Sequence, residues 1–203
     1  MKLILSFDDY CEENYKLMQL LKKYELEKYT IWFIDLRNKE AMKQIKYLSG
    51  AGFEIGCHTF SHPPDLKQLN NAELLNEIID AKMMIEGIIN KPICWFCPPR
   101  GRYDNRVIRL ISGVYKYLRT VDLFNIKRRK DEYIKPTTIH IYPRKEYNGR
   151  HWLELAKEWF LKAKKENETF HIWGHAEEIN RLNEWDNLEI FFKFLKENYN
   201  GNN

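Results

Sequence analysis

Carboxylate and imidazole side chains stand at positions where they could carry out metal-assisted chemistry. Asp8 and Asp9 are adjacent and follow a short apolar run. Two carboxylates so placed repel each other when they are desolvated, and a nearby cation removes that repulsion. One carboxylate could then bind the cation while the other accepts a proton. The alternative is a solvated pair that caps the following helix, and the two aspartates alone leave both interpretations open.

Two of the six histidines lie four residues apart, at His58 and His62. Pro63 and Pro64 oppose a helix here, so we expect the two imidazoles to converge from a strand end and its loop. Two histidines and one aspartate leave positions open for water, as in catalytic rather than structural zinc sites. The alternative is a pair of histidines on the surface.

A third histidine, His175, follows an apolar run and Gly174 near the end of the chain. Histidine is the natural proton donor near neutral pH, so His175 is a candidate general acid. Glu178 either fixes the tautomer of His175 or is an acidic residue at the start of a helix. His171 lies within the apolar run, and we expect it to be a structural residue.

These side chains need elements to position them, and strand and helix patterns alternate along the chain. Apolar and β-branched runs predict strands at 2–7, 30–36, 53–58, 93–96, 115–120, 137–142 and 169–173. Helical spacing predicts helices at 13–23, 39–49, 105–112, 152–163 and 188–195, and a long helix that opens with a capping box at Asn70 and Glu73 and stops at Pro92. Residues 125–135 are predicted to be a loop.

Such alternation favours βα units and a parallel sheet. About seven strands exceed what a small doubly wound sheet requires, so we predict an α/β fold, a distorted or incomplete (β/α) barrel, in one domain over residues 1–203. Active sites of such folds lie at the carboxyl ends of the strands. Asp8, Asp9, His58, Arg100 and His175 all fall there.

Composition excludes several classes of function. The 203 residues carry a formal net charge of +4, too small a basic excess to indicate nucleic-acid binding. No apolar stretch is long enough to be a signal peptide or to span a membrane, so we expect a cytoplasmic protein with four reduced cysteines. Cys94 and Cys97 form a lone CxxC, which we interpret as coincidence. The basic segment 126–130 is a solvated loop or, alternatively, a site for an acidic glycan or phosphate.

Taken together, the motifs resemble those of the polysaccharide deacetylase family, also called the NodB-homology family. Residues 6–9 (Ser-Phe-Asp-Asp) resemble its first motif, and residues 58–62 (His-Thr-Phe-Ser-His) its second, the metal-binding pair. Residues 97–101 (Cys-Pro-Pro-Arg-Gly) resemble the third, usually Arg-x-Pro-aromatic-Gly. Residues 117–121 resemble the strand before the fourth, and residues 173–175 (Trp-Gly-His) resemble the fifth. The first two motifs are specific in combination, and the other three are weak alone.

The resemblance implies a hydrolase that removes the N-acetyl group of an amino sugar or glycan with the help of one divalent metal ion. Zn²⁺ is the expected ion, with Co²⁺, Ni²⁺ or Fe²⁺ as alternatives. Asp9, His58 and His62 would bind the ion, Asp8 would be the general base and His175 the general acid. The remaining residues expected to bind substrate or support the site are Pro98, Pro99, Arg100, Gly101 and Glu178.

One position departs from the family pattern. The arginine that opens the third motif pairs with the base aspartate in the family, and Cys97 stands in its place. A neutral thiol cannot orient a carboxylate as a guanidinium does, so Arg100 is the candidate to reach Asp8 instead. This departure keeps two alternatives open: an amidohydrolase acting on a small linear or cyclic amide, and a barrel that binds glycan without catalysis.

Overall fold

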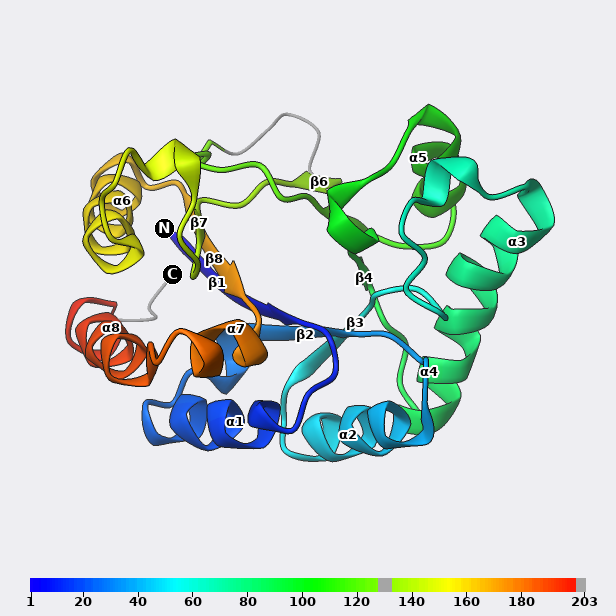
Figure 1. Cartoon of the computed structure of the whole chain (residues 1–203), viewed down its shortest axis with the longest axis horizontal. Helices are drawn as coiled ribbons and strands as arrows, with labels where there is room; N and C mark the ends of the chain where they lie inside the picture. The colour runs from blue at the N-terminus through cyan, green and yellow to red at the C-terminus, as the bar shows by residue number, and fades with distance from the viewer. Residues whose placement is uncertain (128–132, 200–203) are drawn as a thin grey trace.

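The computed structural model describes residues 1–127 and 133–199, and its framework is one curled sheet of eight parallel strands (Figure 1). The strand order is β6-β5-β4-β3-β2-β1-β8-β7, so the sheet stays open between β6 and β7. The strands are β1 (Lys2–Asp8), β2 (Thr30–Ile34), β3 (Glu54–Cys57), β4 (Trp95–Phe96), β5 (Tyr117–Arg119), β6 (Ile134–Lys135), β7 (Ile139–His140) and β8 (Thr169–Gly174). The predicted incomplete barrel is therefore confirmed.

Helices cover the outer side of the curl, with α6 and α8 at one end and α3, α4 and α5 at the other (Figure 1). Their bounds are α1 (Glu13–Lys23), α2 (Lys39–Gly50), α3 (Asn71–Leu75), α4 (Ala81–Ile89), α5 (Asn105–Ser112), α6 (Trp152–Glu166), α7 (Ala176–Arg181) and α8 (Trp185–Asn198). A π-helical turn, η3 (Asn76–Asp80), joins α3 to α4. None of the described helices is long and apolar enough to cross a membrane.

Alternation along the strands divides the buried residues into two layers. Leu3, Leu5 and Phe7 of β1 pack in the large core beneath the helices. The residues between them face the inside of the curl, where a small apolar cluster forms from Ile4, Ile31, Phe33, Trp95 and Cys97. The polar residues Ser6 and Asp8 continue this inner face of β1 towards its carboxyl end, so the strand that builds the core also carries a carboxylate to the site.

The long helix begins as predicted. The Asn70 side chain accepts the Glu73 backbone N–H at 3.0 Å, and the Glu73 carboxylate accepts the Asn70 N–H at 2.8 Å, which is a complete capping box. The helix then widens into η3, where one turn leaves regular α-helical spacing. Apolar periodicity did not predict this π-helical turn, which places Glu77 towards the candidate site.

The predicted loop over residues 125–135 was wrong at its end. Ile134–Lys135 forms β6, which pairs with β5 and is a strand in addition to the seven predicted. Two residues are too few to show alternation, so the strand had no signal of its own. Of the basic segment 126–130, Ile126 is buried and Lys127 exposed, while positions 128–130 lie outside the described residues. All four cysteines are free thiols, so the lone CxxC is not a disulfide.

Candidate active site

The end of β1 turns sharply and points two carboxylates in different directions. Asp8 is the last residue of the strand and is 3% exposed. Asp9 has φ of 66°, in the left-handed region that non-glycine residues rarely adopt. Its backbone is held by two hydrogen bonds, because its N–H donates to the Phe33 carbonyl at 2.9 Å and its carbonyl accepts the Asn14 amide at 2.9 Å. Because of this turn the two side chains point to different places, so one can face a metal ion while the other accepts a proton.

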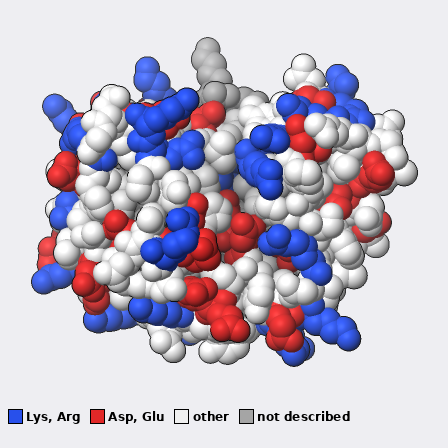
Figure 2. All heavy atoms as spheres, in the orientation of Figure 1, with Lys and Arg blue, Asp and Glu red and all other residues white. Residues whose placement is uncertain are grey.

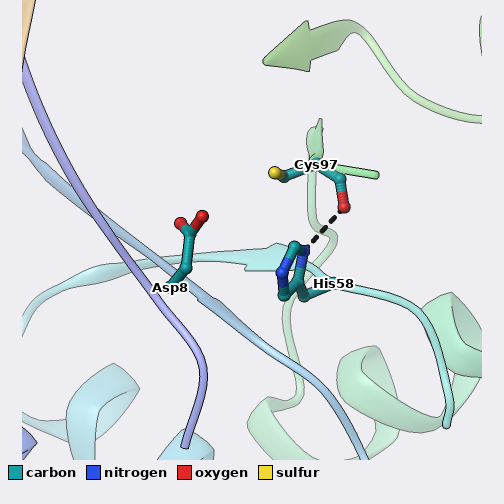
Figure 3. Close-up of side chains that lie close together, drawn as sticks. All are labelled: Asp8, His58 and Cys97. Carbon is teal, nitrogen blue, oxygen red and sulfur yellow. Dashed lines mark hydrogen bonds between the residues drawn. The ribbon is translucent and has the colours of Figure 1, made fainter. Parts of the chain in front are cut away.

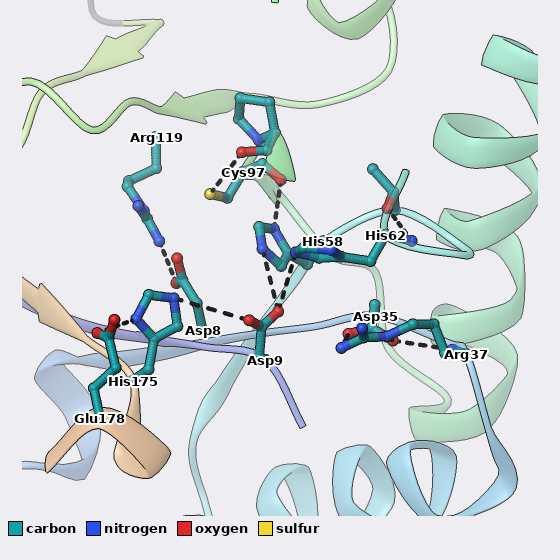
Figure 4. A network of polar contacts seen from close by, with 12 residues as sticks. Asp8, Asp9, Asp35, Arg37, His58, His62, Cys97, Arg119, His175 and Glu178 are labelled. Atoms are coloured by element: carbon teal, nitrogen blue, oxygen red, sulfur yellow. Dashed lines mark hydrogen bonds and ion pairs between the residues drawn. The ribbon is translucent and has the colours of Figure 1, made fainter. Parts of the chain in front are cut away.

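The loop after β3 brings both predicted imidazoles to Asp9 (Figure 4). The Oδ1 atom of Asp9 lies 3.6 Å from Nε2 of His58 and 3.3 Å from Nε2 of His62. Nδ1–H of His58 donates to the Cys97 carbonyl at 2.7 Å, which leaves Nε2 with a free lone pair facing Asp9 (Figure 3). Burial, together with the nearby His58, lowers the pKa of His62. The lowered pKa favours the neutral, metal-binding form of His62, and the hydrogen bond at Nδ1 leaves Nε2 of His58 directed at Asp9.

Asp9, His58 and His62 fit a divalent metal ion. Their ligand atoms lie within 4.8 Å of one another, and Oδ1 of Asp9 is buried without a hydrogen-bond partner among the described residues. Separations of 3.3 and 3.6 Å suit atoms bound to one ion, since zinc–nitrogen and zinc–oxygen bonds are about 2.0–2.2 Å. A bound cation would satisfy an oxygen that is otherwise left unpaired.

The loop that carries the two histidines is fastened by Glu77 from the π-helical turn. The Glu77 carboxylate is buried and accepts the backbone N–H groups of Phe60 and Ser61, both at 2.9 Å, and the Ser61 hydroxyl at 2.6 Å. Within the loop, the His62 N–H donates to the Thr59 hydroxyl at 3.0 Å. The loop is thus fixed from outside as well as from within.

On the other side of Asp9, His175 lies at the start of α7 with Glu178 behind it. Nδ1 of His175 donates to the Glu178 carboxylate at 2.6 Å, and Nε2 faces the pocket 3.9 Å from Oδ2 of Asp9. The same Glu178 oxygen lies 3.2 Å from Nε2 of His140. Burial opposes charge on His175, but the Glu178 bond and the Asp8 charge outweigh it and raise its pKa. Bonds from the two histidines likewise outweigh burial at Glu178 and lower its pKa to about 2.

The arginine beside Asp8 is one that the sequence did not single out. Among residues 1–127 and 133–199, the ion-pair partner of Asp8 is Arg119 of β5, which donates from Nη2 to Oδ1 of Asp8 (Figure 4). Arg100 is exposed and does not make the contact expected of it. Burial alone would raise the pKa of Asp8, but the Arg119 charge and hydrogen bond, helped by nearby histidines, lower it.

The remaining predicted residues, in the segment 98–101, are not among those that line the pocket. Pro98 and Pro99 are buried, and Gly101 has φ of 66° with no room for a side chain, because a Cβ would lie 2.3 Å from Val121. Substrate contact by these residues stays a prediction. His171 is structural as expected: it is fully buried and shares a 2.9 Å hydrogen bond with the Ser6 hydroxyl.

The site opens into a pocket of about 260 Å³ lined by Asp8, Asp9, Tyr10, Cys11, Arg37, His175, Glu177 and Glu178. Figure 2 shows acidic side chains gathered near the middle of this face, with basic side chains on either side. The guanidinium of Arg37 is held at the rim by buried Asp35, which accepts its Nε at 2.7 Å and its Nη2 at 2.9 Å. The pocket can admit a small polar group next to the aspartates and His175.

Solved structures share this fold at low sequence identity. A polysaccharide deacetylase from Bacillus cereus is 19% identical, with a TM-score of 0.62 over 96% of this chain and 87% of that one. A peptidoglycan N-acetylglucosamine deacetylase is 19% identical, with a TM-score of 0.66 over 97% and 82%. A CE4 family pseudoenzyme from Bacillus anthracis is 18% identical, with a TM-score of 0.62 over 96% of this chain and 60% of that one. This chain therefore spans less than two thirds of the pseudoenzyme's length.

Sequence comparison is more specific. No curated protein sequence matches the chain. Residues 1–114, more than half of the chain, match the polysaccharide deacetylase family. This segment contains both aspartates, both metal-facing histidines and Cys97. The chain belongs to the polysaccharide deacetylase family.

Proposed function

We propose that this protein is a metal-dependent deacetylase that hydrolyses the N-acetyl group of an amino sugar within a glycan. The observation that carries the proposal is the convergence of Asp9, His58 and His62, from two strand ends, around an unpaired buried oxygen. Asp8 and His175 lie next to that point and line one pocket. The family supports deacetylation, and the residues themselves support the metal.

In this mechanism, Asp9, His58 and His62 would hold the ion. When bound, the ion supplies Lewis acidity that polarises the acetyl carbonyl and lowers the pKa of water beside it. Asp8 accepts the proton of the attacking water as the oxygen bonds to the carbonyl carbon. His175 donates a proton to the nitrogen as the carbon–nitrogen bond breaks, so acetate and a free amine leave. Glu178 accepts the Nδ1–H of His175 and favours the protonated ring, so the proton on Nε2, which faces the pocket, is the one donated.

The test is acetate release by purified protein loaded with Zn²⁺, on oligomers of N-acetylglucosamine and on a panel of small linear and cyclic amides. The His58→Ala variant should lose bound metal, whereas Asp8→Asn should keep the metal and lose turnover. Full acetate release by the Asp8→Asn variant would overturn the role given to Asp8. Turnover of small amides alone would favour the amidohydrolase alternative.

A non-catalytic barrel is the other alternative, because the CE4 fold also includes the pseudoenzyme from Bacillus anthracis. The five side chains that the mechanism requires are nevertheless all present here: Asp8, Asp9, His58, His62 and His175. Absence of turnover on every N-acetyl substrate, with one equivalent of metal bound, would favour that alternative.

A further inference from the structure

Arg119 is an unusual residue to find inside the sheet. Its side chain is fully buried, and in the described part of the chain its ion-pair partner is Asp8, whose side chain is also buried. The guanidinium lies over the rings of Phe33 and Trp173, with centroid distances of 5.1 and 4.7 Å. A buried charge is tolerated only when it is paired, so Arg119 and Asp8 depend on each other.

Strand register explains how Arg119 on β5 comes to lie beside Cys97, at the level of the sheet where the family has its arginine. Trp95 pairs with Tyr117, and Phe96 pairs with Leu118. The next residues along the two strands, Cys97 and Arg119, are therefore neighbours at one level of the sheet. Both face the inside of the curl, since the pair before them, Phe96 and Leu118, packs in the outer core.

Cys97 and Arg119 share Asp8 as a neighbour, but only Arg119 can hold it. The Cys97 sulfur, an Asp8 oxygen and a His58 nitrogen lie within 4.8 Å of one another (Figure 3). Burial raises the pKa of the Cys97 thiol well above its usual range, so the thiol is neutral. Its hydrogen bond is directed to the Pro98 carbonyl at 3.6 Å and not to Asp8. The orienting contact thus comes from β5.

The contact also assigns the two oxygens of Asp8. Arg119 binds Oδ1, while Oδ2 has no hydrogen-bond partner among residues 1–127 and 133–199, and Asp8 lines the pocket. An Asp8 held by one oxygen keeps the other free to accept a proton from water. We propose that Arg119 is the positioning residue for Asp8, and that the arginine of the family's third motif has been replaced by one on the neighbouring strand. This inference rests on the proposed function.

The first experiment removes the positive charge. Arg119→Met should lower kcat about 100-fold, because a general base displaced by an ångström loses roughly that factor. KM and bound metal should change little, since Asp9, His58 and His62 remain. Arg109→Met, an exposed arginine on α5, is the matched control and should behave as wild type. Measured against the residual acetate release of Asp8→Asn over long incubations, adding Arg119→Met should cause no further loss if Arg119 acts only through Asp8.

The second experiment restores a positive charge near Asp8 by placing an arginine at position 97, directly after β4. Adding Cys97→Arg to Arg119→Met should recover at least tenfold of the lost kcat, whereas Cys97→Arg alone places two guanidinium groups beside one carboxylate and should lower kcat. If Arg119→Met does not fold, Arg119→Lys keeps the charge but not the planar fork, and an intermediate kcat is expected.

The outcomes separate the inference from the proposed function. Inactive wild-type protein with metal bound would defeat the proposed function itself. Active wild-type protein with unchanged kcat in folded Arg119→Met or Arg119→Lys would overturn the role of Arg119 alone. Additive losses in the Asp8→Asn background would likewise overturn it, because they would show that Arg119 acts independently of Asp8.

Discussion

His171 should make the protein lose stability in mild acid. Its imidazole is fully buried, and burial, with the nearby Arg119 charge, lowers its pKa to about 3. In the unfolded chain the pKa of histidine is about 6.5. As pH falls below that value, the unfolded state binds a proton that the native state does not, so stability decreases towards pH 3. At pH 5 the difference spans roughly 1.5 pH units, or about 2 kcal/mol at about 1.36 kcal/mol per unit.

Urea unfolding followed by tryptophan fluorescence at pH 7.5 and pH 5.0 measures this effect. The His171→Gln variant keeps a polar partner for the Ser6 hydroxyl but cannot titrate, so its acid-induced loss should be about 2 kcal/mol smaller than that of wild type. His151→Gln, which changes a side chain that is 39% exposed, leaves His171 in place and should retain the wild-type loss. Equal losses in wild type and His171→Gln would refute the reasoning.

Three further predictions concern the loop, the metal and the inner face of the sheet. Glu77→Gln should weaken metal binding about 10-fold or more in a chelator competition, because an NH2 group, which cannot accept from the donors of the loop between His58 and His62, replaces one of the two carboxylate oxygens; unchanged affinity would contradict this. Zn²⁺ at about 1,000 times its Kd should raise the free energy of unfolding by about 4 kcal/mol, and not at all in His58→Ala. Gly56→Ala should destabilise the fold by about 1–3 kcal/mol in urea unfolding, because a Cβ there would lie 2.4 Å from the Phe33 ring; wild-type stability would show that the ring moves aside.

Local patterns were sufficient to predict most of the framework. Apolar runs mark the strands because a parallel sheet covered by helices is buried, and the Asn70–Glu73 capping box marks a helix start that the structure confirms. Patterns failed where an element is too short to have a period, as at Ile134–Lys135, and where helical spacing hides a widened turn, as at Asn76–Asp80. Both failures lie in segments whose conformation is decided by neighbours distant in sequence.

The side chains that line the site were predictable to the extent that each stands at a strand end. Asp8, Asp9, His58, His62 and His175 could be brought together because the carboxyl ends of parallel strands meet at one edge. The fastening of their loop by Glu77 was not predictable, since it depends on which way a π-helical turn points a side chain. The sequence of a strand indicates how far along the strand a residue lies. Which side chains that residue contacts depends on how the elements pack.

Arg119 shows what signal could have found the missing partner. It lies between Leu118 and Thr120 in a run predicted to be a strand, and in the structure all three residues are at most 1% exposed. A charged residue in a buried strand needs an opposite charge at its own level, because an unpaired guanidinium would lose its hydration without compensation. Asp8 was the available carboxylate on the inner face of the sheet. A search for the family motif expects the arginine at position 97 and does not find it. A search for a buried positive charge that could pair with Asp8 leads to Arg119 on β5.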